Sequence, residues 1–87
     1  MADYKVIVRQ SAIDELSDID NKTLQRLARL IGALSESPTA AENAVKFSSR
    51  NFYRMRQGTY RISYFVDEID RVVDVFKVGQ RKNIFGQ

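Results

Sequence analysis

Apolar and polar positions repeat with two different periods along this chain, and each period predicts a different element. Residues 4–9 alternate, with Tyr4, Val6 and Val8 on one side of the backbone, which favours a short strand. Residues 11–19 predict a short helix capped by Ser11. A second helix follows, because apolar residues recur three and four positions apart and so share one face: Leu24, Leu27, Ala28, Ile31 and Leu34.

The second half of the chain has the alternation of hairpin-linked strands. Strands are predicted over residues 52–56, 59–67 and 71–78, with a tight turn at Gln57-Gly58 and an acidic turn over residues 67–70. Pro38 should end the second helix at Ser37, and Gly79 should end the last strand. For residues 39–50 the pattern leaves two alternatives, a helical turn or a bend that joins the sheet.

This order of elements predicts an α+β fold. An N-terminal strand is followed by two antiparallel helices, which pack on one face of a small, mainly antiparallel sheet. The chain should form one domain over residues 1–87, because 87 residues leave no room for a second core.

Composition narrows the chemistry that the chain can perform. It has no cysteine and no histidine, which excludes disulfides, thiolate metal sites and the commonest proton shuttle at neutral pH. No apolar run approaches the ~20 residues of a membrane helix, and the N-terminus lacks the layout of a signal peptide. We therefore expect a cytoplasmic protein without a membrane partner.

The basic residues gather in the second half. Residues 45–87 carry nine basic and four acidic side chains, whereas residues 1–44 carry five and seven. If the apolar side of the predicted sheet lies under the helices, then Arg54, Arg56 and Arg61 share its open face. Guanidinium groups suit phosphate, so this face is predicted to bind an anion such as nucleic acid. The alternative is a basic face covered by solvent.

Two runs of residues resemble those of the RelE/ParE superfamily of bacterial and archaeal toxins. They are YRMRQGTYRISY (residues 53–64) and VGQRK (residues 78–82), which hold a Tyr-Arg step and a Gly-x-Arg motif. The resemblance extends to the opening strand, the two helices and the pair Lys46-Phe47.

The resemblance implies the toxin of a type II toxin–antitoxin module, held inactive by a cognate antitoxin. RelE-like members cut mRNA in the ribosomal A site, and ParE-like members poison DNA gyrase. Carried over to matching positions, Arg61 would grip the scissile phosphate and Arg81 would stabilise the transition state. The resemblance also implies RNA-binding residues around them: Lys46, Arg54, Arg56, Lys82 and Phe85.

One position departs from the RNA-cutting members. They commonly carry a tyrosine four residues after the arginine of Gly-x-Arg, where this chain has Phe85. A phenyl ring can stack on a base but cannot move a proton, so Lys82 or Lys46 would serve as the base. Ribosome-dependent mRNA cleavage is the function expected first, without a metal or other cofactor. Gyrase inhibition, or a toxin fold with little activity, is the alternative.

Overall fold

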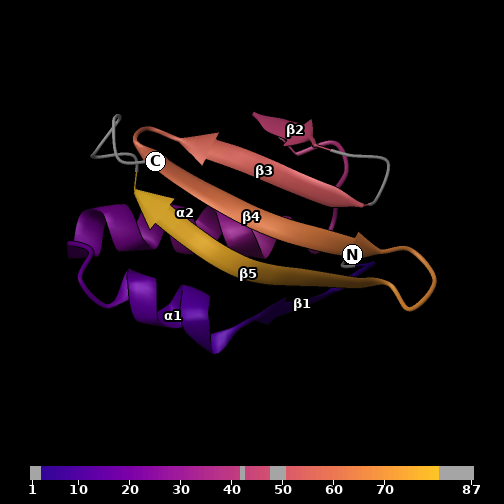
Figure 1. Cartoon of the computed structure of the whole chain (residues 1–87), viewed down its shortest axis with the longest axis horizontal. Coiled ribbons are helices and arrows are strands. Elements are labelled where there is room, and N and C mark those ends of the chain that lie inside the picture. The colour runs from indigo at the N-terminus through magenta and orange to yellow at the C-terminus, as the bar shows by residue number, and fades with distance from the viewer. Residues whose placement is uncertain (1–2, 42, 48–50, 81–87) are drawn as a thin grey trace.

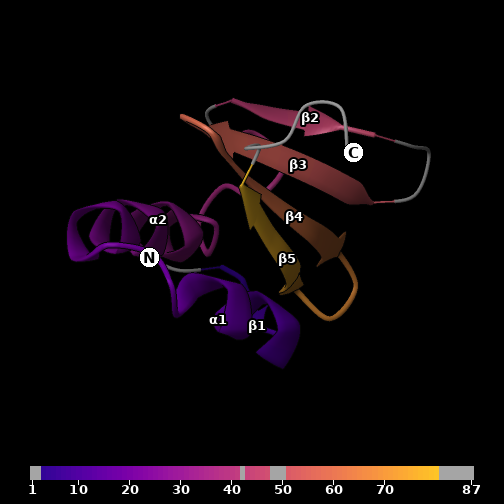
Figure 2. The ribbon, with the colours of Figure 1, turned by 60° about the vertical axis from the view of Figure 1, so that its left-hand side comes forward.

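The computed structural model describes residues 3–41, 43–47 and 51–80. Two helices lie behind a five-stranded sheet and run in opposite directions (Figures 1 and 2). The predicted α+β architecture is therefore confirmed. In chain order the elements are β1 (Lys5–Val8), α1 (Gln10–Leu16), α2 (Asn21–Ala33), β2 (Ala44–Lys46), β3 (Phe52–Gln57), β4 (Tyr60–Asp67) and β5 (Val72–Gln80).

The sheet has the order β1-β5-β4-β3-β2. Its two ends differ, because β1 pairs in parallel with β5 while the other neighbours are antiparallel. Within residues 39–50, which the sequence left open, Ala44–Lys46 join the sheet as the edge strand β2. The predicted turn between β3 and β4 forms at Gly58, whose φ of 61° lies in the left-handed region that glycine adopts without strain.

The core lies between the helices and the sheet. As the alternation predicts, the buried apolar side chains of β3 and β4 come from one side of each strand: Tyr53, Met55, Ile62, Tyr64 and Val66. They pack with Ala12 of α1, with Leu27 and Ile31 on α2, and with Leu34 at the C-cap of α2. Ala28 is exposed, contrary to the expected apolar face. None of the helices in the described part of the chain has the length and hydropathy needed to cross a bilayer.

The first helix is held by the edge of β5, and the prediction for Ser11 was wrong. Helix α1 begins at Gln10, one residue earlier, and its N-cap Arg9 makes no side-chain capping bond. Instead, the Ser11 hydroxyl donates to the Phe76 carbonyl at 2.9 Å. The Glu15 carboxylate accepts the Val78 N–H at 3.0 Å. Since β1 pairs with β5 only as far as Val75, α1 supplies partners to the β5 edge beyond it.

Two predicted ends were also wrong. Helix α2 ends at Ala33, before Ser37, and its start is capped by Asp20, which accepts the Thr23 N–H. Strand β5 continues through Gly79, which pairs with Arg61 in β4. The hydrogen bonds of the ladder outweigh the weak intrinsic strand preference of glycine here.

A buried tyrosine ties the segment after α2 to the sheet. The Tyr64 hydroxyl donates to the Pro38 carbonyl at 2.6 Å, and its ring stacks on Tyr53 with centroids 5.6 Å apart. Burial, with a smaller contribution from Tyr53, raises the pKa of Tyr64 to about 12.

We expect the Tyr64→Phe variant to be less stable by about 1–2 kcal/mol, because the Pro38 carbonyl loses its partner. The native state holds the phenol proton more tightly than the unfolded chain does. The contribution of Tyr64 is therefore complete below pH 10.0 and is lost as the pH rises toward about 12. Denaturant unfolding at neutral pH and above pH 10.0 should show a steeper loss for wild type than for Tyr64→Phe. An equal loss of stability with pH in wild type and Tyr64→Phe would contradict this explanation. Tyr60→Phe is the matched control.

The edge contact of α1 gives a second prediction. Glu15→Ala should cost about 1–2 kcal/mol and expose the Val78 amide to hydrogen exchange, because that N–H loses its acceptor. Glu15→Gln keeps an oxygen at the same place, so its Val78 amide should stay protected. Equal protection of Val78 in wild type and Glu15→Ala, measured by NMR, would show that the bond does not hold this edge.

Candidate functional site

The pairing of β3 with β4 brings three arginines together on the face opposite the helices. Arg56 lies directly across from Arg61, and Arg54 lies across from Ser63. Residues paired in this way project on the same side of the sheet. On its other side, Arg61 is paired with Gly79 of β5, which carries no side chain. The predicted grouping of Arg54, Arg56 and Arg61 on the open face is therefore present.

These arginines line two adjoining cavities. The first has a volume of about 240 Å³ and is mostly polar, with the lining residues Glu15, Arg54, Arg61, Ser63, Lys77, Gly79 and Gln80. The second has a volume of about 290 Å³ and is lined by Val45, Phe47, Arg54, Arg56 and Arg61. Arg54 and Arg61 belong to both, so they form the wall between the two cavities.

The charges around the first cavity are unequal. Among the described lining residues, Arg54, Arg61 and Lys77 stand against one carboxylate, that of Glu15, which lies 3.8 Å from the Lys77 ammonium. Glu15 also accepts the Val78 N–H. The cavity is therefore net positive and open to an anion, and the Ser63 hydroxyl in its lining can add a hydrogen bond.

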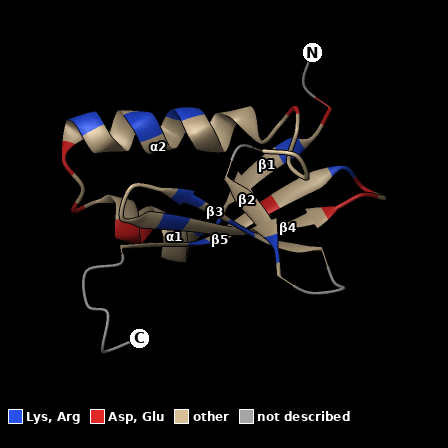
Figure 3. Cartoon of the chain, turned by 90° about the horizontal axis from the view of Figure 1, so that it is seen from above, with Lys and Arg blue, Asp and Glu red and all other residues tan. Residues whose placement is uncertain are grey.

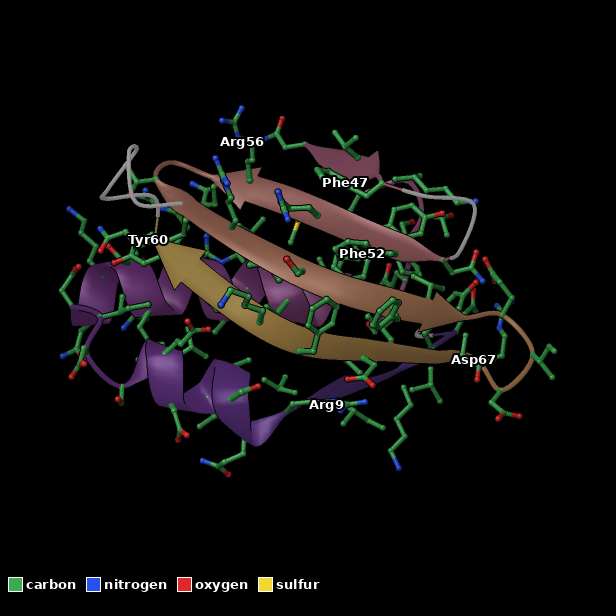
Figure 4. All side chains as sticks on the ribbon, in the orientation of Figure 1. Arg9, Phe47, Phe52, Arg56, Tyr60 and Asp67 are labelled. Carbon is green, nitrogen blue, oxygen red and sulfur yellow. The ribbon has the colours of Figure 1, made fainter. Side chains whose placement is uncertain are left out.

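A packed ring orients one of the three guanidinium groups. The guanidinium carbon of Arg54 lies 4.4 Å from the centroid of the Phe47 ring, within cation–π distance. Figure 4 shows Phe47 beside β2, near Phe52 at the start of β3, with Arg56 toward the other end of β3 and Asp67 at the end of β4.

Comparison with known proteins identifies the family. A family model described as the ParE toxin of the type II toxin–antitoxin system ParDE matches residues 6–85. The chain belongs to the ParE toxin family. This confirms the resemblance to the RelE/ParE superfamily.

Individual relatives agree with that assignment. The toxin is 26% identical over 88 residues to a Methanocaldococcus jannaschii protein named "Putative toxin RelE1", covering 94% of each chain. The fold of this chain is similar to that of a chain in the RelE–RelB complex of Pyrococcus horikoshii. The TM-score is 0.79 at 22% identity, over 93% of this chain and 98% of the other. The intact RelBE toxin–antitoxin complex of E. coli is similar (TM-score 0.76, 22% identity, 92% and 99%).

The remaining predicted site residues of the toxin do not all join this group. Lys46 pairs with Tyr53, whose side chain is buried on the helix side, so Lys46 projects away from Arg54. Arg81, Lys82 and Phe85 lie outside the described residues. Their roles stay predictions.

Lys77 is the cavity residue that sequence reasoning missed. Strict alternation from Val73 and Val75 would send Lys77 into the core. A bulge interrupts the register, so that Ser63 pairs with Lys77 while Tyr64 pairs with Val75. Val78 then becomes the next buried valine and Lys77 reaches the open face. The spacing of the three valines was the available signal.

The cavities suit a phosphate better than a metal ion. Among the residues that the structure describes, no group of three or more His, Cys, Asp or Glu side chains could hold a metal. A second basic surface lies on α2, where Lys22, Arg26 and Arg29 are exposed. Figure 3 marks the basic positions along this helix in blue. Removing a positive charge from this surface is therefore a control for the loss of charge alone.

We expect sulfate to raise the unfolding temperature of the toxin more than chloride at equal ionic strength, because an anion bound to the folded state adds stability beyond the general stabilisation by excluded sulfate, which all variants share. At ten times its dissociation constant, sulfate would add about 1.4 kcal/mol, or several degrees. Arg54→Gln should remove most of this difference, whereas Arg29→Gln on α2 should keep it. The same sulfate effect in wild type and Arg54→Gln would place the anion elsewhere.

Proposed function

We propose that this toxin is a ribosome-dependent endonuclease that cuts mRNA and so stops translation. The observation that carries the proposal is the cavity shared by Arg54, Arg61 and Lys77 on the open face of the sheet. Three cations around one polar cavity suit a phosphate that gains charge during reaction. The similarity to a protein named "Putative toxin RelE1" supports the same interpretation.

The reaction is an in-line attack within the RNA. The ribose 2′-hydroxyl loses its proton and its oxygen bonds to the neighbouring phosphorus, while the bond from phosphorus to the 5′-oxygen breaks. The 5′-oxygen takes up a proton, which leaves a 2′,3′-cyclic phosphate and a 5′-hydroxyl. Arg61 holds the scissile phosphate, Arg54 and Arg56 hold its neighbours, and Arg81 stabilises the charge of the transition state.

Proton transfer falls to a lysine in this proposal. The chain has no histidine, and Phe85 stands where RNA-cutting relatives carry tyrosine. Lys46 projects to the other side of the sheet from Arg54, so we assign the base to Lys82. A lysine accepts a proton only in its uncharged form, and a positive charge close to an ammonium group favours that form.

The partner that controls this activity is an antitoxin. Solved relatives include complexes of RelE with RelB, in which toxin and antitoxin are bound together. For this chain we propose an acidic segment that folds on binding and covers the arginines of the open face.

Gyrase inhibition is the second candidate, and one finding favours it. The matching family model is that of ParE rather than RelE. In that case the basic face would bind its target without hydrolysis, and Phe85 would need no catalytic replacement.

Mapping RNA 5′ ends in cells after brief induction tests the proposal. We expect new ends within the codons of translated mRNA. Arg61→Ala should reduce them about 100-fold or more, the usual effect of losing a preorganised charge partner. Arg29→Ala on α2 should leave them unchanged.

Two results would contradict the proposal. Intact mRNA together with DNA breaks would favour gyrase as the target. Cleavage that persists in a folded Arg61→Ala protein would show that Arg61 does not hold the scissile phosphate.

A further inference from the structure

Four phenylalanine rings form a continuous cluster on the open face, next to the arginines. Phe65 and Phe76 stack at a centroid distance of 4.8 Å, and Phe52 contacts both at 5.4 and 5.6 Å. Phe47 completes the cluster at 5.6 Å from Phe52. In Figure 4, Phe52 lies over β3 on the side away from the helices. These contacts hold Phe47, the outermost ring of the cluster, in place.

Phe47 is held in place but is not covered. Its backbone N–H donates to the Phe52 carbonyl at 2.9 Å, which continues the pairing of β2 with β3. Even so, the residue is 49% exposed. Exposing a large apolar ring costs free energy, so a ring fixed at the surface by its neighbours indicates a contact with another molecule.

The cavity beside Phe47 combines an apolar wall with a basic rim. Val45 and Phe47 supply the apolar wall, and Arg54, Arg56 and Arg61 supply the rim. Its volume of about 290 Å³ is at the lower end for small-ligand sites. It therefore has room for one planar group with an attached anion rather than for a long segment.

We propose that this cavity is a base-stacking site, which holds one unpaired nucleobase of single-stranded RNA against Phe47 and Arg54. The phosphates on either side of that base contact Arg56 and Arg61. The site deepens the proposed function, on which it rests for RNA as the ligand. It assigns to Phe47 the base contact that the sequence alone placed at Phe85.

The paired ring and guanidinium favour RNA over an acidic peptide. Carboxylates need only the N–H edges of arginine, and the aliphatic side chains of a peptide need only an apolar surface. The Arg54 guanidinium lies over the Phe47 ring, 4.4 Å from its centroid, so a flat group in the cavity can contact a cation and a ring together. Aromatic rings and guanidinium planes in a basic groove are how proteins hold unpaired bases.

A short RNA with one 2-aminopurine tests the site on the purified full chain. Its ribose hydroxyls are methylated so that it cannot be cut, and anisotropy with base fluorescence reports affinity and stacking. Phe47→Leu keeps an apolar side chain but removes the ring. We expect it to bind RNA about tenfold more weakly and to lose the fluorescence quenching, while Phe47→Trp keeps both. Ile13→Ala, which changes an exposed apolar side chain on α1 outside both the phenylalanine cluster and the cavity, should stay within about twofold of wild type.

The competing occupant is tested on the same proteins with an acidic amphipathic peptide. If Phe47→Leu binds and quenches the RNA as wild type does, the base site is overturned. It is equally overturned if wild type binds only the peptide. A folded Phe47→Leu protein is verified by its unfolding temperature. Intact mRNA in induced cells would refute the nuclease proposal alone, since the RNA oligomer reports binding without cleavage.

Discussion

The pairing of β3 with β4 is the constraint on which the rest of the toxin depends. Each strand buries every second side chain under the helices, and Tyr64 fixes the register from inside by bonding to the Pro38 carbonyl. The side chains between the buried ones have only the open face to occupy. A slip of one residue would bury the arginines and expose the core. The same register therefore determines both the packing of the core and the grouping of the guanidinium groups.

The bulge in β5 extends this principle to a third strand. It turns Lys77 toward Arg61 and leaves Val78 in the core. The same stretch of β5 lies beyond the reach of β1, and α1 supplies its partners through Ser11 and Glu15. The helix that closes the core on one side therefore also places a carboxylate at the rim of the cavity on the other.

Much of the fold and part of the site could be read from the sequence, for physical reasons. Alternation predicts which face of β3 and β4 is buried, because a strand offers only two faces, and so Arg54, Arg56 and Arg61 were found. Tertiary bonds decided the rest. Ser11 resembles a helix cap locally but bonds to β5, Gly79 resembles a break but pairs with Arg61, and the place of Lys77 depends on a bulge. The family was recognised from short motifs, which a pattern of apolar and polar positions does not reveal.

In the proposed function, the open face of the sheet is the surface that binds RNA. The most direct test is an NMR titration of the toxin, with labelled arginine side chains, by a short uncleavable RNA. If the open face binds the RNA, the Nε–H resonances of Arg54, Arg56 and Arg61 shift together with a common affinity, while those of Arg26 and Arg29 on α2 stay in place. Shifts confined to Arg26 and Arg29 would contradict it.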